Sequence, residues 1–180
     1  MKNNHRYYTY MKYLRKMDSR GFTLMELLIV MVILSILVAI ATGSYASSSR
    51  RGRDNRRKND LRSLATALEA YYNDKGVYPT GSGGIMMGCG ALDAQACSWG
   101  GVFRDQYNTL YMVLIPKDPI TSQTYYYVSP SGTNYKAYAK LENTKDAGDW
   151  VDQNGYVNTN CSQSSMVECT YGVASGDTSP

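Results

Sequence analysis

Glu26 is the one charged side chain in the twenty-residue apolar run from Phe22 to Ala41. A carboxylate in the hydrocarbon of a bilayer costs roughly 2.5–3.5 kcal/mol on insertion scales, so it is expected to have a partner or a function. A glutamate near the start of a helix is also stabilised by the positive end of the helix dipole. The sequence therefore predicts either pairing with a cation or stabilisation of the helix's own N-terminus.

All four cysteines follow the apolar run and fall into two pairs, each eight residues apart in the chain: Cys89, Cys97, Cys161 and Cys169. Paired zinc ligands usually have only two to four residues between them, so this spacing is too wide for a zinc site. An even number of cysteines in a small exported domain predicts disulfide bonds on the oxidising side of a membrane. Three connectivities are open, and short loops favour Cys89–Cys97 and Cys161–Cys169.

Four oxygen-bearing side chains lie close together in the segment KDAGDWVDQNG: Asp146, Asp149, Asp152 and Asn154. Carboxylate and amide oxygens are the ligands that calcium prefers, which makes Ca²⁺ the one cofactor that the sequence suggests. The spacing does not match an EF-hand, and an ordinary turn between strands uses the same residue types.

Basic side chains gather on both sides of the apolar run. Residues 1–21 contain six basic side chains and one acidic, and residues 50–62 contain seven basic and two acidic. Seven basic groups in one segment could contact the phosphates of DNA. We favour a helix surface that faces water or lipid headgroups and is partly paired with Asp54 and Asp60, so DNA is not an expected partner.

The apolar run is long enough to cross a membrane, because twenty helical residues span about 30 Å. Beyond it, apolar side chains with helical spacing predict a continuing amphipathic helix that ends near Gly76: Leu61, Leu64, Ala65, Leu68, Tyr71 and Tyr72. Between the two parts, Thr42 to Gly52 is rich in glycine and serine, and we expect partial melting or bending there.

After Pro79 the sequence predicts a glycine-rich loop over residues 80–90 and a short helix around Gln106–Leu114. Thr124–Val128 and Tyr135–Leu141 are rich in tyrosine and β-branched residues and predict a β-hairpin. One or two further strands are expected around Gly155–Asn158 and Met166–Val173. The predicted fold class is α+β, with one long N-terminal helix packed against a small antiparallel sheet.

The segment Gly-Phe-Thr-Leu-Met-Glu at 21–26, followed by the apolar run, resembles the prepilin-type cleavage and methylation signal of type IV pilins and type II secretion pseudopilins. The segment Pro-Lys-Asp-Pro at 116–119 and the tyrosine-rich hairpin after it are similar to the same region of major pseudopilins. This chain departs from that pattern where it has Ile120 and Thr121 instead of the common Trp and Gly.

The resemblance implies a cytoplasmic leader at 1–21, a membrane and filament-core helix at 22–41, its continuation at 42–76 and a globular head at 77–180. A prepilin peptidase would cleave after Gly21 and N-methylate Phe22. Glu26 would then pair with the N-terminal amine of a neighbouring subunit, because an unperturbed α-amino group is largely protonated at neutral pH. The chain's one histidine, His5, would be lost with the leader, and no catalytic residue is expected.

The expected protein is thus a structural subunit of a type IV pilus or pseudopilus and not an enzyme. Its expected partners are other copies of itself, the peptidase/methyltransferase, the assembly platform with its ATPase, and membrane lipid before assembly. It would begin as a single-pass protein of the cytoplasmic membrane with its head outside, and end in an extracellular pilus or a periplasmic pseudopilus. The alternatives are a minor pseudopilin at a filament tip and a membrane-anchored binding protein that never polymerises.

Overall fold

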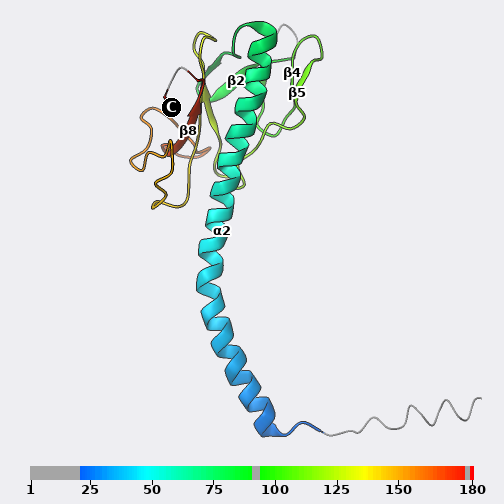
Figure 1. Ribbon diagram of the computed structural model, residues 1–180, viewed down its shortest axis with the longest axis vertical. Coiled ribbons are helices and arrows are strands. Elements are labelled where there is room, and N and C mark those ends of the chain that lie inside the picture. Colours follow the sequence, from blue (N-terminus) through cyan, green and yellow to red (C-terminus); the bar gives the residue numbers. More distant parts are fainter. Residues whose placement is uncertain (1–20, 91–93, 177–178) are drawn as a thin grey trace, which may run out of the picture. The chain divides into compact units, whose positions relative to one another are not determined.

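The computed structural model describes residues 21–90, 94–176 and 179–180 (Figure 1). Apart from Gly21, the leader predicted for residues 1–21 lies outside the described residues. The chain divides into two compact units, residues 1–45 and residues 46–180, which are considered separately below.

The first unit contains the N-terminal part of the helix α2, Leu24–Lys75, with its apolar side chains exposed from Phe22 to Ile40. By length and composition this helix could cross a membrane. A helix that is apolar on all sides needs lipid or other helices around it, because water cannot solvate that surface favourably.

Of the partial melting or bending predicted for Thr42 to Gly52, the melting is wrong, because α2 is assigned as one helix from Leu24 to Lys75, and the bending stays a prediction. Two glycines in a helix cost only about 1 kcal/mol each relative to alanine. Strong helix on both sides offsets this cost, because adding a residue to an existing helix is far easier than starting a new one.

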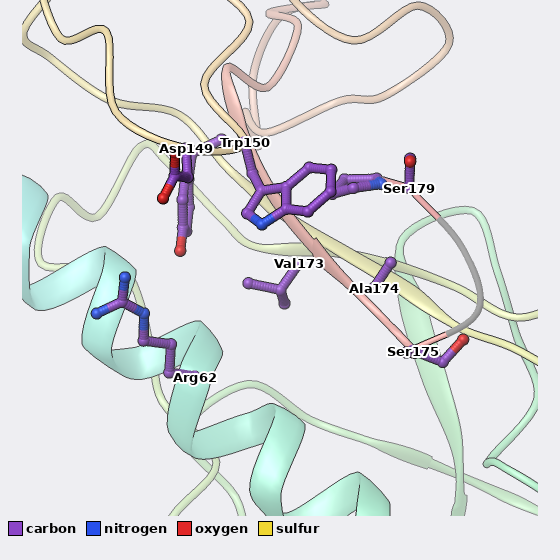
Figure 2. A pocket seen from close by; sticks show the side chains of 10 residues that line it. Arg62, Asp149, Trp150, Val173, Ala174, Ser175 and Ser179 are labelled. Carbon is purple, nitrogen blue, oxygen red and sulfur yellow. The ribbon is translucent and has the colours of Figure 1, made fainter.

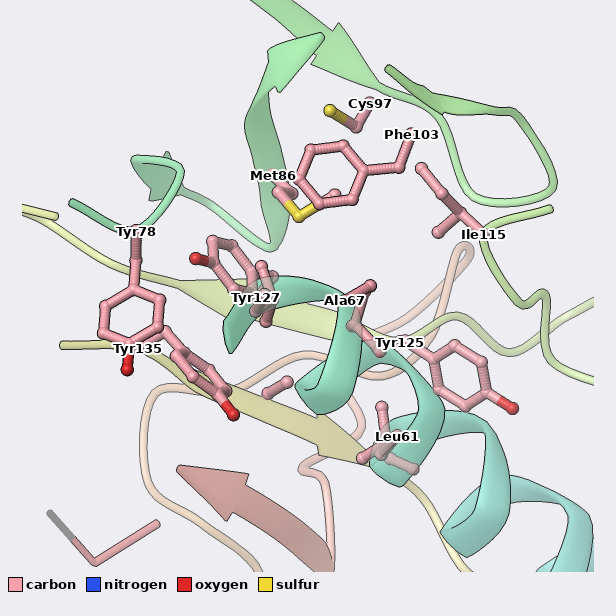
Figure 3. Packing of buried hydrophobic residues seen from close by; sticks show 14 of the residues in the cluster. Leu61, Ala67, Tyr78, Met86, Cys97, Phe103, Ile115, Tyr125, Tyr127 and Tyr135 are labelled. Carbon is pink, nitrogen blue, oxygen red and sulfur yellow. The ribbon is translucent and has the colours of Figure 1, made fainter. Parts of the chain in front are cut away.

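The second unit is built on the C-terminal part of α2, whose predicted apolar stripe is confirmed. Leu61, Leu64 and Leu68 are fully buried and pack in a core with aromatic side chains from the rest of the unit (Figure 3). Tyr72, at the edge of the stripe, is 39% exposed. The helix ends as predicted at Gly76, whose φ of 73° suits glycine and whose N–H donates to the carbonyl of Tyr72 at 2.7 Å.

Three small antiparallel sheets, with the strand orders β1-β2-β3, β4-β5 and β6-β7-β8, complete the second unit. Their bounds are Gly81–Ser82 (β1), Ile85–Cys89 (β2), Gln95–Cys97 (β3), Phe103–Arg104 (β4), Leu110–Met112 (β5), Tyr126–Val128 (β6), Lys136–Ala139 (β7) and Tyr171–Ala174 (β8). The predicted hairpin is confirmed as β6 and β7, which pair with Tyr127 opposite Ala137. In the segment Met166–Val173 a strand begins only at Tyr171, as β8.

Two local predictions are wrong, and of the one or two further strands expected only one forms, each for a reason in the backbone. Residues 80–90 are not a plain loop, because β1 and β2 pair with each other there. The helix expected at Gln106–Leu114 is replaced by a turn and β5, since Asp105 accepts the backbone N–H groups of residues 107 and 109. No strand forms at Gly155–Asn158, because both end residues of that segment have positive φ, 91° and 61°.

Two disulfide bonds close short loops of the second unit. Cys89–Cys97 joins the ends of β2 and β3, and Cys161–Cys169 closes the loop that precedes β8. These are the pairs favoured from the sequence. The second bond lies in a small cluster of its own with Tyr138, separate from the main core.

The fully buried Leu64 gives a test of the helix-to-head packing. Leu64→Ala should lower the free energy of unfolding of the detergent-solubilised chain by about 2–5 kcal/mol, because it leaves a cavity in the core. The neighbouring exposed Ser63→Ala is the control and should change it by less than about 0.5 kcal/mol. Similar losses in both variants, measured by denaturant unfolding, would contradict the packing described here.

Candidate functional site

Glu26 lies in the first turn of α2 and caps its N-terminus together with Thr23. The Glu26 carboxylate accepts hydrogen bonds from the backbone N–H of Thr23 at 2.9 Å and from its hydroxyl at 3.0 Å, both on Oε2. In return the Thr23 hydroxyl oxygen accepts the backbone N–H of Glu26 at 3.2 Å. This reciprocal arrangement is a capping box, so the single chain shows the second of the two roles considered for Glu26.

The capping box satisfies hydrogen bonds but supplies no positive charge. Thr23 is neutral, so a carboxylate in an apolar segment still gains from a cation. The spacing Thr-x-x-Glu before an apolar run is the signature of this cap, so the capping role of Thr23 is readable from the sequence although it is not among the predictions above.

Gly21 and Phe22 precede the first residue of α2 and lie in non-helical, exposed backbone. The Phe22 side chain is 85% exposed. The peptide bond between them is therefore accessible, as cleavage by a peptidase requires. Cleavage after Gly21 and N-methylation of Phe22 stay predictions.

The second charged site is a buried arginine on the part of α2 that belongs to the head. The side chain of Arg57 has no exposed surface, and its guanidinium contacts three carboxylates. It binds Asp118 with two parallel bonds, from Nε at 2.8 Å and from Nη2 at 3.0 Å. Nη1 donates to Asp54 at 2.7 Å and to Glu142 at 2.8 Å. Burial disfavours the charge, yet the bonds to Asp118 and Glu142 outweigh it and raise the pKa of Arg57.

Arg53, one turn before Arg57, completes this cluster. Its Nε and Nη2 donate to the two oxygens of Glu142 at 2.7 and 2.6 Å. The hydrogen bond from Arg53, reinforced by Arg57, lowers the pKa of Glu142 to about 2. Asp54 in turn accepts the backbone N–H groups of Glu142 and Asn143, at 2.9 and 2.8 Å. We call these five side chains, Arg53, Asp54, Arg57, Asp118 and Glu142, the arginine cluster.

The arginine cluster joins three segments of the second unit: α2, the Pro-Lys-Asp-Pro loop and the chain just after β7. Asp118 also accepts the N–H of Ile120 at 2.8 Å, which fixes the loop itself. The sequence indicates a family resemblance for this loop but predicts no role for Asp118 or Glu142. The signal for the role of Asp118 is that an acidic residue lies between Pro116 and Pro119 in a chain whose helix carries a cluster of basic residues.

The basic segment 50–62 is therefore largely used within the molecule. Besides Arg53 and Arg57, Lys58 pairs with Asp146 at 2.8 Å, and Arg56 lies 3.8 Å from Asp60. The pairing foreseen with Asp54 and Asp60 is present, although Arg57 is buried and does not face water. The exposed bases of the segment are Arg50, Arg51, Arg56 and Arg62.

The four residues suggested for calcium do not converge. Asp146 binds Lys58, and the hydrogen bond from Lys58 lowers the pKa of Asp146. Asp152 accepts the N–H of Asn154 at 2.9 Å in a turn, and Asp149 is exposed. Across the described ranges, no group of three or more His, Cys, Asp or Glu side chains is placed to hold a metal ion. Calcium at these residues stays a prediction without support from their arrangement.

Together, the apolar helix with its cap, the continuation of that helix through the core and the small antiparallel sheets define an α+β protein of the pilin class. Comparison with known proteins agrees. Residues 16–42 match the family described as the prokaryotic N-terminal methylation motif, and residues 44–154 match that of type II secretion system protein G. The chain belongs to the type II secretion system protein G family.

Individual relatives extend this result. The chain is 32% identical over 120 residues to the type II secretion system core protein G of Vibrio cholerae, covering 67% of this chain and 76% of that protein. It is 28% identical over 138 residues to core protein G of Klebsiella pneumoniae, covering 73% of this chain and 94% of that one. The type IV major pilin protein PilA of Myxococcus xanthus is 38% identical over 60 residues, which is 33% of this chain and 27% of PilA. No solved structure matches the chain significantly.

The family match ends at residue 154, so β8 and the Cys161–Cys169 bond lie beyond it. The arginine cluster lies entirely within it. This family consists of structural pilus and pseudopilus subunits and is not a family of enzymes.

Arg57→Met should lower the free energy of unfolding by about 3–5 kcal/mol, because it leaves buried carboxylates without their cation. The control is Arg56→Met on the adjacent, exposed position, which should cost less than about 1 kcal/mol. Denaturant unfolding of both variants with the disulfides intact measures the difference. Equal effects would show that the buried cation does not hold the head together.

The lowered pKa of Glu142 predicts a pH dependence of stability. Since the pKa of Glu142 is about 2 in the folded chain and ordinarily 4.5, its contribution to stability is complete above pH 4.5 and is lost as the pH falls toward 2. Glu142→Gln should flatten the fall in stability over this range relative to wild type. Parallel curves for the two proteins in pH-dependent thermal unfolding would contradict the role of Glu142.

Proposed function

We propose that this protein is a structural subunit of a type IV pilus or pseudopilus, processed after Gly21 and polymerised through its N-terminal helix. The observation that carries the proposal is the position of Glu26: a carboxylate with a neutral cap, four residues after the expected new N-terminus, in an apolar helix. Family membership and the similarity to core protein G support the same function.

The proposed assembly step brings together two costly charges. Cleavage after Gly21 frees the α-amino group of Phe22, which carries a positive charge at neutral pH, and methylation keeps that charge. An ammonium and a carboxylate that are each unfavourable in lipid are both relieved when they pair. If the ammonium comes from Phe22 of one subunit and the carboxylate from Glu26 of the next, the pair sets the stagger between neighbouring helices.

The helix surface is suited to such a transfer from lipid to polymer. Its apolar side chains from Phe22 to Ile40 are exposed in the single chain, so neighbouring helices can replace lipid against them. Before assembly the helix would anchor the subunit in the cytoplasmic membrane. The two disulfide bonds support a head outside the cytoplasm, because such bonds persist in oxidising compartments.

The expected partners follow from this cycle. A prepilin peptidase with N-methyltransferase activity would process residues 21 and 22, and an assembly platform with its ATPase would move the subunit out of the membrane. Further copies of the chain would form the filament, with no catalytic step by the subunit itself.

The substitution Glu26→Gln separates the two roles of this residue. Glutamine can still accept hydrogen bonds in the capping box, so helix formation and membrane insertion should be unchanged, but it cannot balance an ammonium. Filament yield, measured as sheared or pelleted subunit beside a working assembly system, should fall at least about tenfold. The control is Ser35→Ala, which removes a hydroxyl that donates to the Met31 carbonyl of its own helix at 2.7 Å and should leave the yield unchanged.

Normal filament yield from Glu26→Gln would reduce the residue to its capping role and overturn the proposed pairing. Mass spectrometry of the wild-type N-terminus distinguishes the remaining alternative. N-methyl-phenylalanine at residue 22 is expected, whereas a chain that keeps Met1 and stays in the bilayer would be an anchored binding protein.

A further inference from the structure

The hairpin formed by β4 and β5 presents apolar side chains to solvent on one flank of the head. Five of them are between 46% and 76% exposed within residues 102–114: Val102, Tyr107, Leu110, Val113 and Leu114. Single exposed apolar residues are ordinary, but a group on one small hairpin indicates an interaction surface. We call residues 102–114 the β4–β5 lobe.

A cavity of about 520 Å³ lies between the head part of α2 and the C-terminal segment, and Trp150 forms part of its wall. Figure 2 shows Arg62 reaching from α2 on one side, with Asp149 and Trp150 above it and Val173 and Ala174 of β8 behind. The indole of Trp150 is 54% exposed. We call this hollow the Trp150 cavity.

The backbone holds Trp150 in an unfavourable conformation. Its φ is 60°, a region that large side chains rarely adopt and that costs of order 1–3 kcal/mol. The surrounding structure maintains it, because the Trp150 carbonyl accepts the N–H of Gly172 at 3.1 Å and the hydroxyl of Tyr156 at 2.9 Å. Strain that leaves a large aromatic ring exposed beside a cavity indicates that the ring is there to be contacted.

The two surfaces lie on opposite flanks of the head. In Figure 1 the strands β4 and β5 are on one side of the upper part of α2, and β8 with the loops before it is on the other. They cannot meet within one copy. Two different surfaces of one chain that meet between copies make a head-to-tail contact, which propagates into an open helical polymer.

Charge is complementary between the two surfaces. Arg104 on the β4–β5 lobe and Lys117 just after it are exposed, while the lobe's acid, Asp105, is already bound to Lys75 at 2.8 Å. The opposite flank carries the exposed Asp149 at the cavity, while Asp152 and Glu168, in the segment between Asp149 and β8, are half-buried and do not line the cavity. Among the described residues that line the cavity, Arg62 is the one base. Residues 146–168 contain four acids and no base, and one of these acids, Asp146, is already paired with Lys58. Such complementarity selects a partner and its orientation.

We propose that the β4–β5 lobe of one copy docks into the Trp150 cavity of the next copy in the filament. Apolar side chains of the lobe cover the Trp150 ring, and a basic side chain of the lobe faces Asp149. This contact rests on the proposed polymerisation and adds to it a second point of attachment, between heads, that is independent of the pairing at Glu26. The occupant is a second copy, because both complementary surfaces belong to the same chain.

Photo-crosslinking in filaments of the full chain tests the contact directly. A benzophenone amino acid at Val113 should cross-link to a peptide of another copy that contains Asp149 and Trp150, as identified by mass spectrometry. The matched control is the same probe at Ser131, an exposed position in the turn between β6 and β7, which should not yield this peptide. Cross-links from Val113 to another region, to a different protein, or only at the level of the Ser131 control would overturn the proposal.

Charge exchange gives a second, functional readout. The double substitution Arg104→Glu and Lys117→Glu should lower filament yield about tenfold, since it places acids opposite Asp149, and Asp149→Lys in the same chain should restore most of the yield. All three positions are exposed, so each variant should fold. If the double variant gives wild-type yield while Glu26→Gln is still defective, the contact between heads is overturned and the pairing at Glu26 is not. A wild-type chain that forms no filament would overturn the proposed function, and the contact with it.

Discussion

One buried guanidinium organises the head of this protein. Arg57 has no exposed surface, and its charge is tolerable only because Asp118, Asp54 and Glu142 surround it at hydrogen-bond distances. These partners come from α2, from the Pro-Lys-Asp-Pro loop and from the chain after β7, so all three segments must be in place at once. A buried ion pair is weak evidence for high stability, because desolvation offsets much of its attraction. Its effect here is specificity: any arrangement that misplaces one segment leaves a charge without a partner.

Features of the fold that depend on residues close together in the sequence could be predicted from the sequence. The stripe beginning at Leu61 and the helix end at Gly76 follow from spacing and backbone freedom, and the β6–β7 hairpin follows from residue types. The predictions failed where one side chain redirected the backbone. Asp105 bonds two N–H groups and converts an expected helix into a turn, and glycine-rich residues 80–90 form strands because they pair with each other and are tied to β3 by Cys89–Cys97.

The candidate sites also differ in whether their partners are close in the sequence. Glu26 can be identified from the sequence because it is a charged residue in an apolar run. Its partner Thr23 is only three residues away, so their contact could also be predicted. The partners of Arg57 could not be predicted from the sequence, because Asp118 and Glu142 are 61 and 85 residues away in the chain. A run of basic residues indicates a charged surface, and only the folded head shows which member is buried. The same limit applies to the β4–β5 lobe and the Trp150 cavity, which exist as surfaces only after the strands have paired.

Arg57 is a charge buried in the head and Glu26 is a charge in an apolar helix, but of the two only Arg57 is neutralised by partners that the structure describes. This difference indicates that Arg57 has a structural role and Glu26 a role in assembly. Arg57 has its full set of oppositely charged partners within the chain, so nothing outside the molecule is needed to stabilise it. Among the residues that the structure describes, the Glu26 carboxylate bonds Thr23, which satisfies hydrogen bonds but supplies no counter-charge in the apolar helix. A cation stabilises a charge left in this state further, and the proposed pairing takes that cation from the N-terminus of a neighbouring copy. The site that the single chain leaves incomplete is therefore the one at which copies should join, whereas the site that the chain completes is the one that gives every copy the same head.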